Sequence, residues 1–336
     1  DWQISDTQGL NFAISVDSVD RIFSSWLDNT PISFPACGSG SPTTEAVTPT
    51  SRPELISARV TATVNVGETP QAVAFDGSHM WVTNTLDDTV SKINVSTNTV
   101  TDTVTVGEAP RGVAFDGSHM WVTNWHDGTV SKINVSTNTV TDTVTVGELP
   151  RGVAFDGSHM WVNNTYDGTV SKINVSTNTV TATVNVGGFS NVKAAFDGSH
   201  MWVTNSNKNM LSKINVSTNT VTATVNVGVT PQGSAFDGSH MWVANLFDNT
   251  VSKINVSTNT VTATVNVGDS PFNVAFDGSH MWVTNAGDGT VSKINVSTNT
   301  VTDTVNVGGI PEGLAFDGSH MWVTNTDSNT VSKFVP

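Results

Sequence analysis

Residue types that carry protein chemistry are scarce in this 336-residue sequence. It has one cysteine, Cys37, so an intramolecular disulfide framework is excluded. Only 13% of the residues are charged, and 29 acidic residues against 14 lysines and arginines give a formal net charge of −15. A surplus of that sign lacks the attraction for phosphate on which nucleic-acid binding depends. Nucleic acids and anionic membranes are therefore not expected partners.

Long apolar runs and enzyme motifs are also missing. A run such as Ala72–Phe75 is far shorter than the roughly 20 apolar residues that cross a bilayer, so no membrane insertion is expected. The sequence has no haem attachment motif, glycine-rich phosphate loop or serine-nucleophile elbow. We therefore expect a protein that is not an enzyme, with no catalytic residue, no cofactor and no metal.

A repeat dominates what is present. The hexapeptide Asp-Gly-Ser-His-Met-Trp occurs seven times at a spacing of 40 residues, except for one interval of 41. Its tryptophans are Trp81, Trp121, Trp161, Trp202, Trp242, Trp282 and Trp322. Threonine, valine, asparagine and serine fill the unit, a composition typical of short strands joined by polar turns. Such a period in a strand-rich chain predicts one four-stranded blade per repeat in a radial array.

The strands of one unit follow from alternation and turn residues. We expect them at residues 71–75, 79–84, 89–95 and 99–106. The last repeat ends in its third strand, at residues 331–334, while residues 58–67 form an unmatched fourth strand at the front. Pairing the two would close the ring and remove its open edges. The sequence thus predicts an all-β fold, a seven-bladed β-propeller closed by an N-terminal strand.

One unit also resembles a known repeat. The motifs are Trp81-Val82-Thr83-Asn84, Thr89-Val90-Ser91-Lys92-Ile93, Thr97-Asn98-Thr99-Val100 and Val104-Thr105-Val106-Gly107. Their order and period are similar to the YVTN-type β-propeller repeat, with tryptophan in place of the family's tyrosine. The resemblance covers residues 57–336. It implies a propeller of archaeal and bacterial surfaces whose members bind rather than catalyse, and it supplies no catalytic residues.

The first 56 residues do not contain the repeat. An alternating strand and then a short amphipathic helix over residues 18–28 are expected, too little to fold alone, so the segment should dock on a partner or on the propeller. The docking residues are Leu10, Phe12, Ile14, Ile22, Phe23, Trp26 and Leu27. We divide the chain into an anchoring segment (1–35), a Gly/Ser/Thr/Pro-rich linker (36–56) and the propeller (57–336).

Differences among the seven repeats are confined to two connections. The turn after the second strand and the loop between blades change from repeat to repeat, whereas the other two turns scarcely change. Alternating strand directions bring both changing connections to one end of the ring, which we call the variable face. Its candidate ligand-binding residues are Trp125, His126, Tyr166, Phe189, Phe247, Phe272, Arg111 and Arg151, accompanied by Lys193 and Lys208. The alternative explanation for these differences is neutral sequence drift, because turns tolerate substitution more readily than strands do.

Three repeated features are interpreted as structural. The seven histidines of the hexapeptide should lie far apart around the ring, so they are not expected to bind a metal. Asp127-Gly128 and its equivalents are read as hairpin turns rather than calcium loops. Lys92 and its equivalents are read as strand residues with solvated amino groups.

These observations lead to a first functional hypothesis and two rivals. The first is an extracellular, cell-surface or virion-surface recognition or adhesion propeller that is tethered by residues 1–35 and presents its variable face to a glycan or protein. The second is a structural or decoration subunit of a surface layer, filament or virus particle. A lyase-like enzyme on the same face ranks last, because His126 is the only histidine there.

Overall fold

The computed structural model describes residues 2–5, 11–14, 58–188 and 191–336, which fall into two units. The smaller unit contains β1 (Trp2–Ser5) paired antiparallel with β2 (Asn11–Ile14). The expected strand through Phe12 and Ile14 is therefore present, and its partner β1 was not predicted. The expected helix over residues 18–28, together with Leu10, Ile22, Phe23, Trp26 and Leu27, lies outside the described residues.

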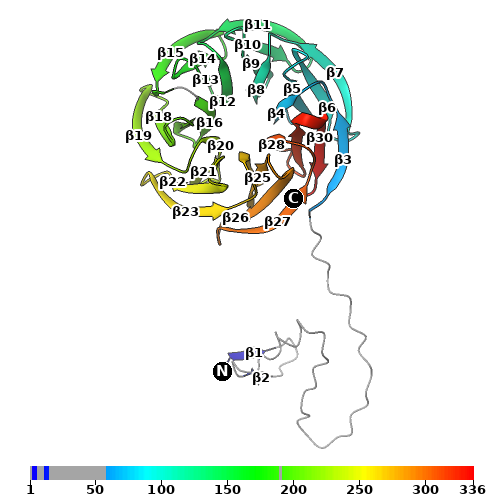
Figure 1. The fold of residues 1–336 in the computed structure, drawn as a ribbon, viewed down its shortest axis with the longest axis vertical. Coiled ribbons are helices and arrows are strands. Elements are labelled where there is room, and N and C mark those ends of the chain that lie inside the picture. The colour runs from blue at the N-terminus through cyan, green and yellow to red at the C-terminus, as the bar shows by residue number, and fades with distance from the viewer. Residues whose placement is uncertain (1, 6–10, 15–57, 189–190) are drawn as a thin grey trace, which may run out of the picture. The chain divides into compact units, whose positions relative to one another are not determined.

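The larger unit is a ring of seven four-stranded antiparallel sheets, which confirms the predicted propeller (Figure 1). Blade 1 consists of β4 (Pro70–Phe75), β5 (His79–Asn84), β6 (Thr89–Asn94) and β7 (Thr99–Thr105), in that order from the inside of the ring outward. Alternating Val and Thr form the strands, and Asp-Gly-Ser-His and Ser-Thr-Asn turn the chain between them.

The other blades repeat this pattern. Their strands are β8 (Pro110–Phe115), β9 (His119–Asn124), β10 (Thr129–Asn134), β11 (Thr139–Thr145), β12 (Pro150–Phe155), β13 (His159–Asn164), β14 (Thr169–Asn174), β15 (Thr179–Asn185), β16 (Asn191–Phe196), β17 (His200–Asn205), β18 (Met210–Asn215), β19 (Thr220–Asn226), β20 (Pro231–Phe236), β21 (His240–Asn245), β22 (Thr250–Asn255), β23 (Thr260–Asn266), β24 (Pro271–Phe276), β25 (His280–Asn285), β26 (Thr290–Asn295), β27 (Thr300–Asn306), β28 (Pro311–Phe316), β29 (Met321–Asn325) and β30 (Thr330–Phe334), with a 3-10 turn at Thr326–Ser328.

Blade 7 is completed by the front of the propeller, as predicted. Its outermost strand is β3 (Val60–Asn65), which pairs antiparallel with β30. Just before β3, the backbone N–H of Ala58 donates to Asp303 Oδ2 of blade 6 at 2.7 Å. The two ends of the propeller therefore share one sheet, and the ring has no unfinished blade.

The hydrophobic core lies between neighbouring blades. Trp81 of blade 1 is fully buried and packs in one cluster with Met120 and Val122 of blade 2, and the arrangement recurs at each of the seven interfaces. The indole N–H of Trp81 needs an acceptor in this apolar setting, and Asp76 Oδ2 accepts it at 2.7 Å. Asp76 Oδ1 also accepts the backbone N–H of Ser78 and of His79. The constant hexapeptide is thus a hydrogen-bonded surface turn that orients each buried tryptophan.

The repeated lysine has a different role from the one expected. Lys92 is only 8% exposed, and its Nζ lies 5.0 Å from the centre of the Trp81 ring. The same Nζ donates to Val135 O at 2.7 Å and Asn138 Oδ1 at 2.9 Å, both in blade 2. The prediction of a solvated amino group is wrong, because the next blade covers the strand and offers two acceptors. The equivalent lysines donate in the same way to the next blade, and we call these hydrogen bonds the lysine ties. They are made by Lys132, Lys172, Lys213, Lys253 and Lys333.

These ties provide a stability test with an internal control. Lys293 keeps the contact with its tryptophan, at 5.1 Å, but among the described residues its amino group has no hydrogen bond to the following blade. Lys92→Met preserves side-chain bulk and leaves Val135 O and Asn138 Oδ1 without that donor, so we expect a loss of about 1–3 kcal/mol in the free energy of unfolding. Lys293→Met removes only the ring contact and should cost less. Urea unfolding of both variants measures the difference, and equal losses would show that the ties contribute nothing.

Candidate functional site

Hydrogen bonds place the two changing connections together at one end of the ring. The β5–β6 turn donates Thr85 N–H to Thr69 O at 3.1 Å and Leu86 N–H to Glu68 O at 3.3 Å. In return, Asp87 Oδ2 accepts the N–H of Glu68 at 2.7 Å. The loop between blades therefore docks on the turn of the blade that follows it, and the variable face is one continuous surface.

The backbone of this face is held in the same way in several blades. An aspartate of the turn accepts an N–H of the loop in blades 1, 2, 3, 5 and 6, through Asp87, Asp127, Asp167, Asp248 and Asp288. This contact gives the Asp-Gly turns, and their equivalents in blades 1 and 5, a structural role. Among the described residues, no cluster of three or more histidine, cysteine, aspartate or glutamate side chains could hold a metal ion. Nor does a helix there have the length and apolar content to span a membrane.

The residue before that aspartate is displayed to solvent, and its identity changes from blade to blade. Leu86 is 68% exposed, Tyr166 58% and Phe247 70%. The equivalent His126 is exposed and its Nδ1 lies 3.0 Å from Glu108 Oε1. Phe189, the other aromatic residue expected on this face, lies outside the described residues. A similar backbone therefore presents a different side chain in blades 1, 2, 3 and 5, whereas blade 6 has Gly287 at this position.

The loops between blades hold an unfavourable backbone conformation. The residue before the strand-opening proline has a positive φ in six of them, and none of the six is glycine. They are Thr69, Ala109, Leu149, Thr230, Ser270 and Ile310, with φ between 47° and 56°. This left-handed region costs a residue with a Cβ roughly 1–2 kcal/mol. Glycine would adopt it freely, so the chain keeps side chains on this face at an energetic cost.

Where the variable face meets the inside of the ring, the second residue of the inner strand varies among the blades. Arg111 of β8 donates from Nη1 to Gln71 Oε1 of β4 at 3.1 Å, and its guanidinium lies 4.6 Å from the centre of the Trp125 ring. Arg151 of β12 lies 5.6 Å from the centre of the Phe272 ring of β24. Four of the predicted binding residues therefore meet at this inner rim, whereas Tyr166, Phe247 and His126 lie on the turns around it.

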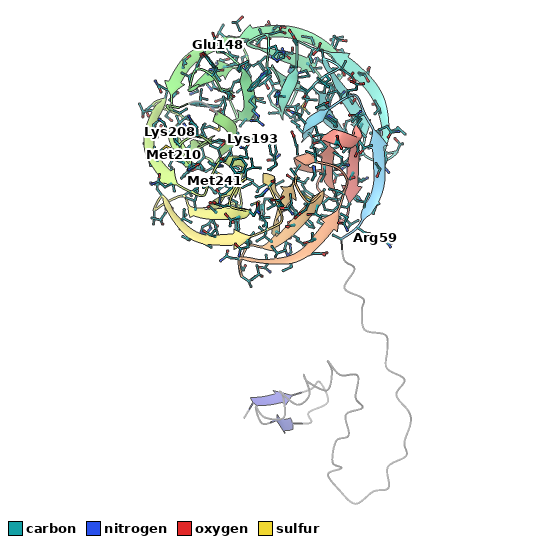
Figure 2. The ribbon with its side chains drawn as sticks, viewed as in Figure 1. Arg59, Glu148, Lys193, Lys208, Met210 and Met241 are labelled. Atoms are coloured by element: carbon teal, nitrogen blue, oxygen red, sulfur yellow. The ribbon has the colours of Figure 1, made fainter. Side chains whose placement is uncertain are left out.

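The inner rim contains a pocket, and two further charged residues line it. Lys193 of β16 and Glu312 of β28 lie with Gln71, Arg111, Arg151 and Phe272 around it, and Figure 2 shows Lys193 on the inner side of the ring. Burial and the neighbouring Arg151 lower the pKa of Lys193 to about 8, and burial together with Arg111 lowers the pKa of Arg151 to about 10. Burial raises the pKa of Glu312 despite the nearby cations. The pocket is thus a poorly solvated, net positive part of an acidic protein.

Gln71 and Glu312 were missed by the sequence analysis, and Lys193 was assigned to a loop rather than a strand. The sequence nevertheless contains a signal that identifies these positions. The residue after the strand-opening proline differs strongly among repeats that are otherwise nearly identical. At the next position Lys193 stands where the other repeats have alanine, glycine or asparagine. Aligning the repeats on Phe75 and its equivalents therefore identifies both positions as an inner ring of varied residues.

Comparison with known proteins supports the fold. No family model matches the chain, and no curated protein matches it. Among solved structures, hydrazine synthase from Kuenenia stuttgartiensis contains a chain that aligns with a TM-score of 0.72 and 16% sequence identity. The alignment covers 80% of this chain and 96% of that one. At this identity the likeness shows a shared propeller fold and nothing of this chain's chemistry.

The comparison also corrects one expectation. The sequence analysis predicted that the chain is not an enzyme, partly because the resembled propellers bind rather than catalyse. Hydrazine synthase is an enzyme and contains this same fold, so that prediction is overturned. A propeller does not argue against catalysis, because the reaction an enzyme performs depends on site residues and not on the scaffold that carries them.

Proposed function

We propose that this chain is a recognition protein that binds a glycan or a protein on its variable face. One observation carries the proposal: a repeated backbone, fixed by the same aspartate contact in five blades, displays a different side chain in four of them, namely Leu86, His126, Tyr166 and Phe247. Recognition sites commonly consist of varied side chains on a rigid scaffold. The exposed Tyr166 and Phe247 supply the flat apolar surfaces on which partners dock.

The backbone strain favours recognition over drift. Drift would accept glycine at the six left-handed positions, because glycine relieves the strain and the loops tolerate change. Instead Thr69, Leu149, Ile310 and their equivalents keep side chains there. Strain that persists at a surface is typical of functional sites.

The repeat family, the location and the role of the N-terminal segment belong to the same proposal. The motif order supports assignment of the repeats to the YVTN type, and that assignment supports a location outside the cell or on a virus particle. Residues 1–35 would tether the propeller to a larger assembly, with Phe12 and Ile14 of β2 among the docking residues. The same exposed aromatics could instead join copies of the chain, and the experiment below separates these outcomes.

Binding can be tested with substitutions that the chain itself uses. Asn207 stands at the position of Tyr166 and Phe247 in blade 4, so Tyr166→Asn and Phe247→Asn should preserve the turn. Screening the full chain against arrays of glycans and surface proteins should give binding that weakens at least about tenfold for each substitution. Thr97→Ala and Thr177→Ala, on the opposite face, are the matched controls and should change nothing.

Two results would contradict the proposal. Binding that survives both aromatic substitutions would place the recognition surface elsewhere. Sedimentation of the chain as an assembly that dissociates when Tyr166 and Phe247 are replaced would show instead that the face joins copies of the protein, as a structural subunit requires.

A further inference from the structure

A cluster of cations lies at the inner rim of the ring, apart from the exposed turns. Arg111, Arg151 and Lys193 come from β8, β12 and β16 of three consecutive blades. Each inner strand begins at the variable face, so its second and third residues lie near that end of the central channel. The three side chains thus line one pocket near the variable face.

Among the described residues, these cations have no carboxylate partner. No described carboxylate lies within 4.0 Å of the charged nitrogens of Arg111, Arg151 or Lys193, and the ion pairs among the propeller's described residues all involve histidines. Arg111 donates to Gln71, but its Nε is buried without an acceptor. Partly buried cations that repel one another and have no carboxylate partner are unfavourable unless something neutralises them. In a structural ion-pair cluster, the Glu312 carboxylate would lie within ion-pair distance of these cations. Here Glu312 forms no such pair with them.

We propose that Arg111, Arg151 and Lys193 form a binding site for the carboxylate group of a small hydroxy acid that enters from the variable face. A guanidinium binds a carboxylate through two parallel hydrogen bonds, and an ammonium adds a third donor. The proposal goes beyond the proposed function and holds whether or not a glycan or protein binds the turns outside.

Size and the remaining lining residues define the ligand class. The pocket has a volume of about 30 Å³, and one water needs about 10–15 Å³ of such space. The enclosed space therefore takes the two oxygens of a carboxylate group, and the rest of the ligand lies outside it. Glu312 is an acceptor that a hydroxyl of the ligand can satisfy. Phe272 supplies an apolar wall for the carbon skeleton.

The repeats supply conservative substitutions for the test. Gln71 and Gln232 occupy the position of Arg151 in other blades, and Ala72 occupies that of Lys193. Arg151→Gln and Lys193→Ala therefore introduce residues that this scaffold already accommodates. Arg59→Gln removes one positive charge from an exposed residue that Figure 2 places on the outer side of the ring, and it is the matched control.

Calorimetric titration of the full chain with sodium glucuronate, in a buffer free of carboxylates, measures the binding. We expect glucuronate to bind, glucose not to bind, and phosphate to bind more weakly than glucuronate. Arg151→Gln and Lys193→Ala should each weaken glucuronate binding at least tenfold, and Arg59→Gln should leave it unchanged. NMR titration of the unsubstituted chain should show that glucuronate raises the pKa of Lys193 from about 8.

Each contrary result overturns the proposal. Absence of glucuronate binding to the unsubstituted chain at millimolar concentration would remove the site. A loss with Arg59→Gln as large as that with Lys193→Ala would show non-specific attraction. Tighter binding of phosphate than of glucuronate would overturn the carboxylate assignment, and an unchanged Lys193 pKa would show that the anion binds elsewhere.

Discussion

A chain that begins at residue 67 should unfold at a temperature about 10 °C or more below that of a chain that begins at residue 57. The shorter chain lacks β3, which supplies the outermost strand of blade 7 and buries Val64 against the core of the closing interface. It also loses the hydrogen bond from Ala58 to Asp303. We estimate the loss at about 5 kcal/mol or more, because a buried valine, a ladder of backbone hydrogen bonds and a covered edge disappear together.

The chain that begins at residue 57 is the control for this experiment. It lacks the same N-terminal segment but keeps β3, so its melting temperature should equal that of the full chain. The chain that begins at residue 67 should also aggregate, because β30 becomes an unpaired edge. Calorimetry and light scattering measure the two effects. Identical melting of both truncated chains would show that ring closure by β3 does not stabilise the propeller.

The second large effect is acid destabilisation through the seven copies of the hexapeptide. Burial and the nearby lysine lower the pKa of His79, His119, His159, His200, His240, His280 and His320 below the usual 6.5. Between pH 6.5 and the lower folded value, the unfolded chain binds more protons than the folded chain. The free energy of unfolding therefore falls as pH decreases through this window, by up to about 1.4 kcal/mol per pH unit for each histidine.

The aspartate of each hexapeptide adds a second window at lower pH. Burial acts to raise the pKa of Asp76, but hydrogen bonds from the Trp81 indole and from the backbone of His79 and Ser78 outweigh it, so the pKa lies below 3.8. The same holds at Asp116, Asp156, Asp197, Asp237, Asp277 and Asp317. A lowered carboxyl pKa stabilises the fold above pH 3.8, and this contribution is lost as the pH falls further.

Urea unfolding between pH 7 and pH 3 measures both windows. Net charge alone predicts the opposite trend at first, because a charge of −15 diminishes toward the isoelectric point near 4.6 and relieves self-repulsion. Replacing His119 and His159 by glutamine should reduce the slope above pH 5, since five shifted histidines remain of seven. A free energy of unfolding that stays constant or rises from pH 7 to pH 5 would contradict the histidine assignment.

The fold was predictable from sequence because one pattern is repeated seven times. A period of 40 residues, four alternating segments and a matched surplus strand at the front leave little choice of topology. The variable face was predictable for the same reason, since strand direction fixes which connections share an end. The topology and the variable face both follow from the order of the strands and turns along the chain.

Contacts between blades were not predictable in this way. Lys92 looks like a solvated strand residue until the next blade supplies Val135 and Asn138 as acceptors. Lys193 and Glu312 are far apart in sequence, and only closure of the ring brings them to one pocket. The prediction that the chain is not an enzyme failed for another reason: it took the absence of motifs and a family resemblance as evidence about chemistry.

Hydrogen exchange of the full chain with and without the strongest partner from the binding screen tests the central claim most directly. If the variable face is the recognition surface, backbone amides at residues 85–88, 125–128 and 165–168 should exchange more slowly in the complex. Amides of the opposite face, at residues 76–79 and 96–99, should be unaffected. Protection of the opposite face with no change in the variable turns would contradict the account.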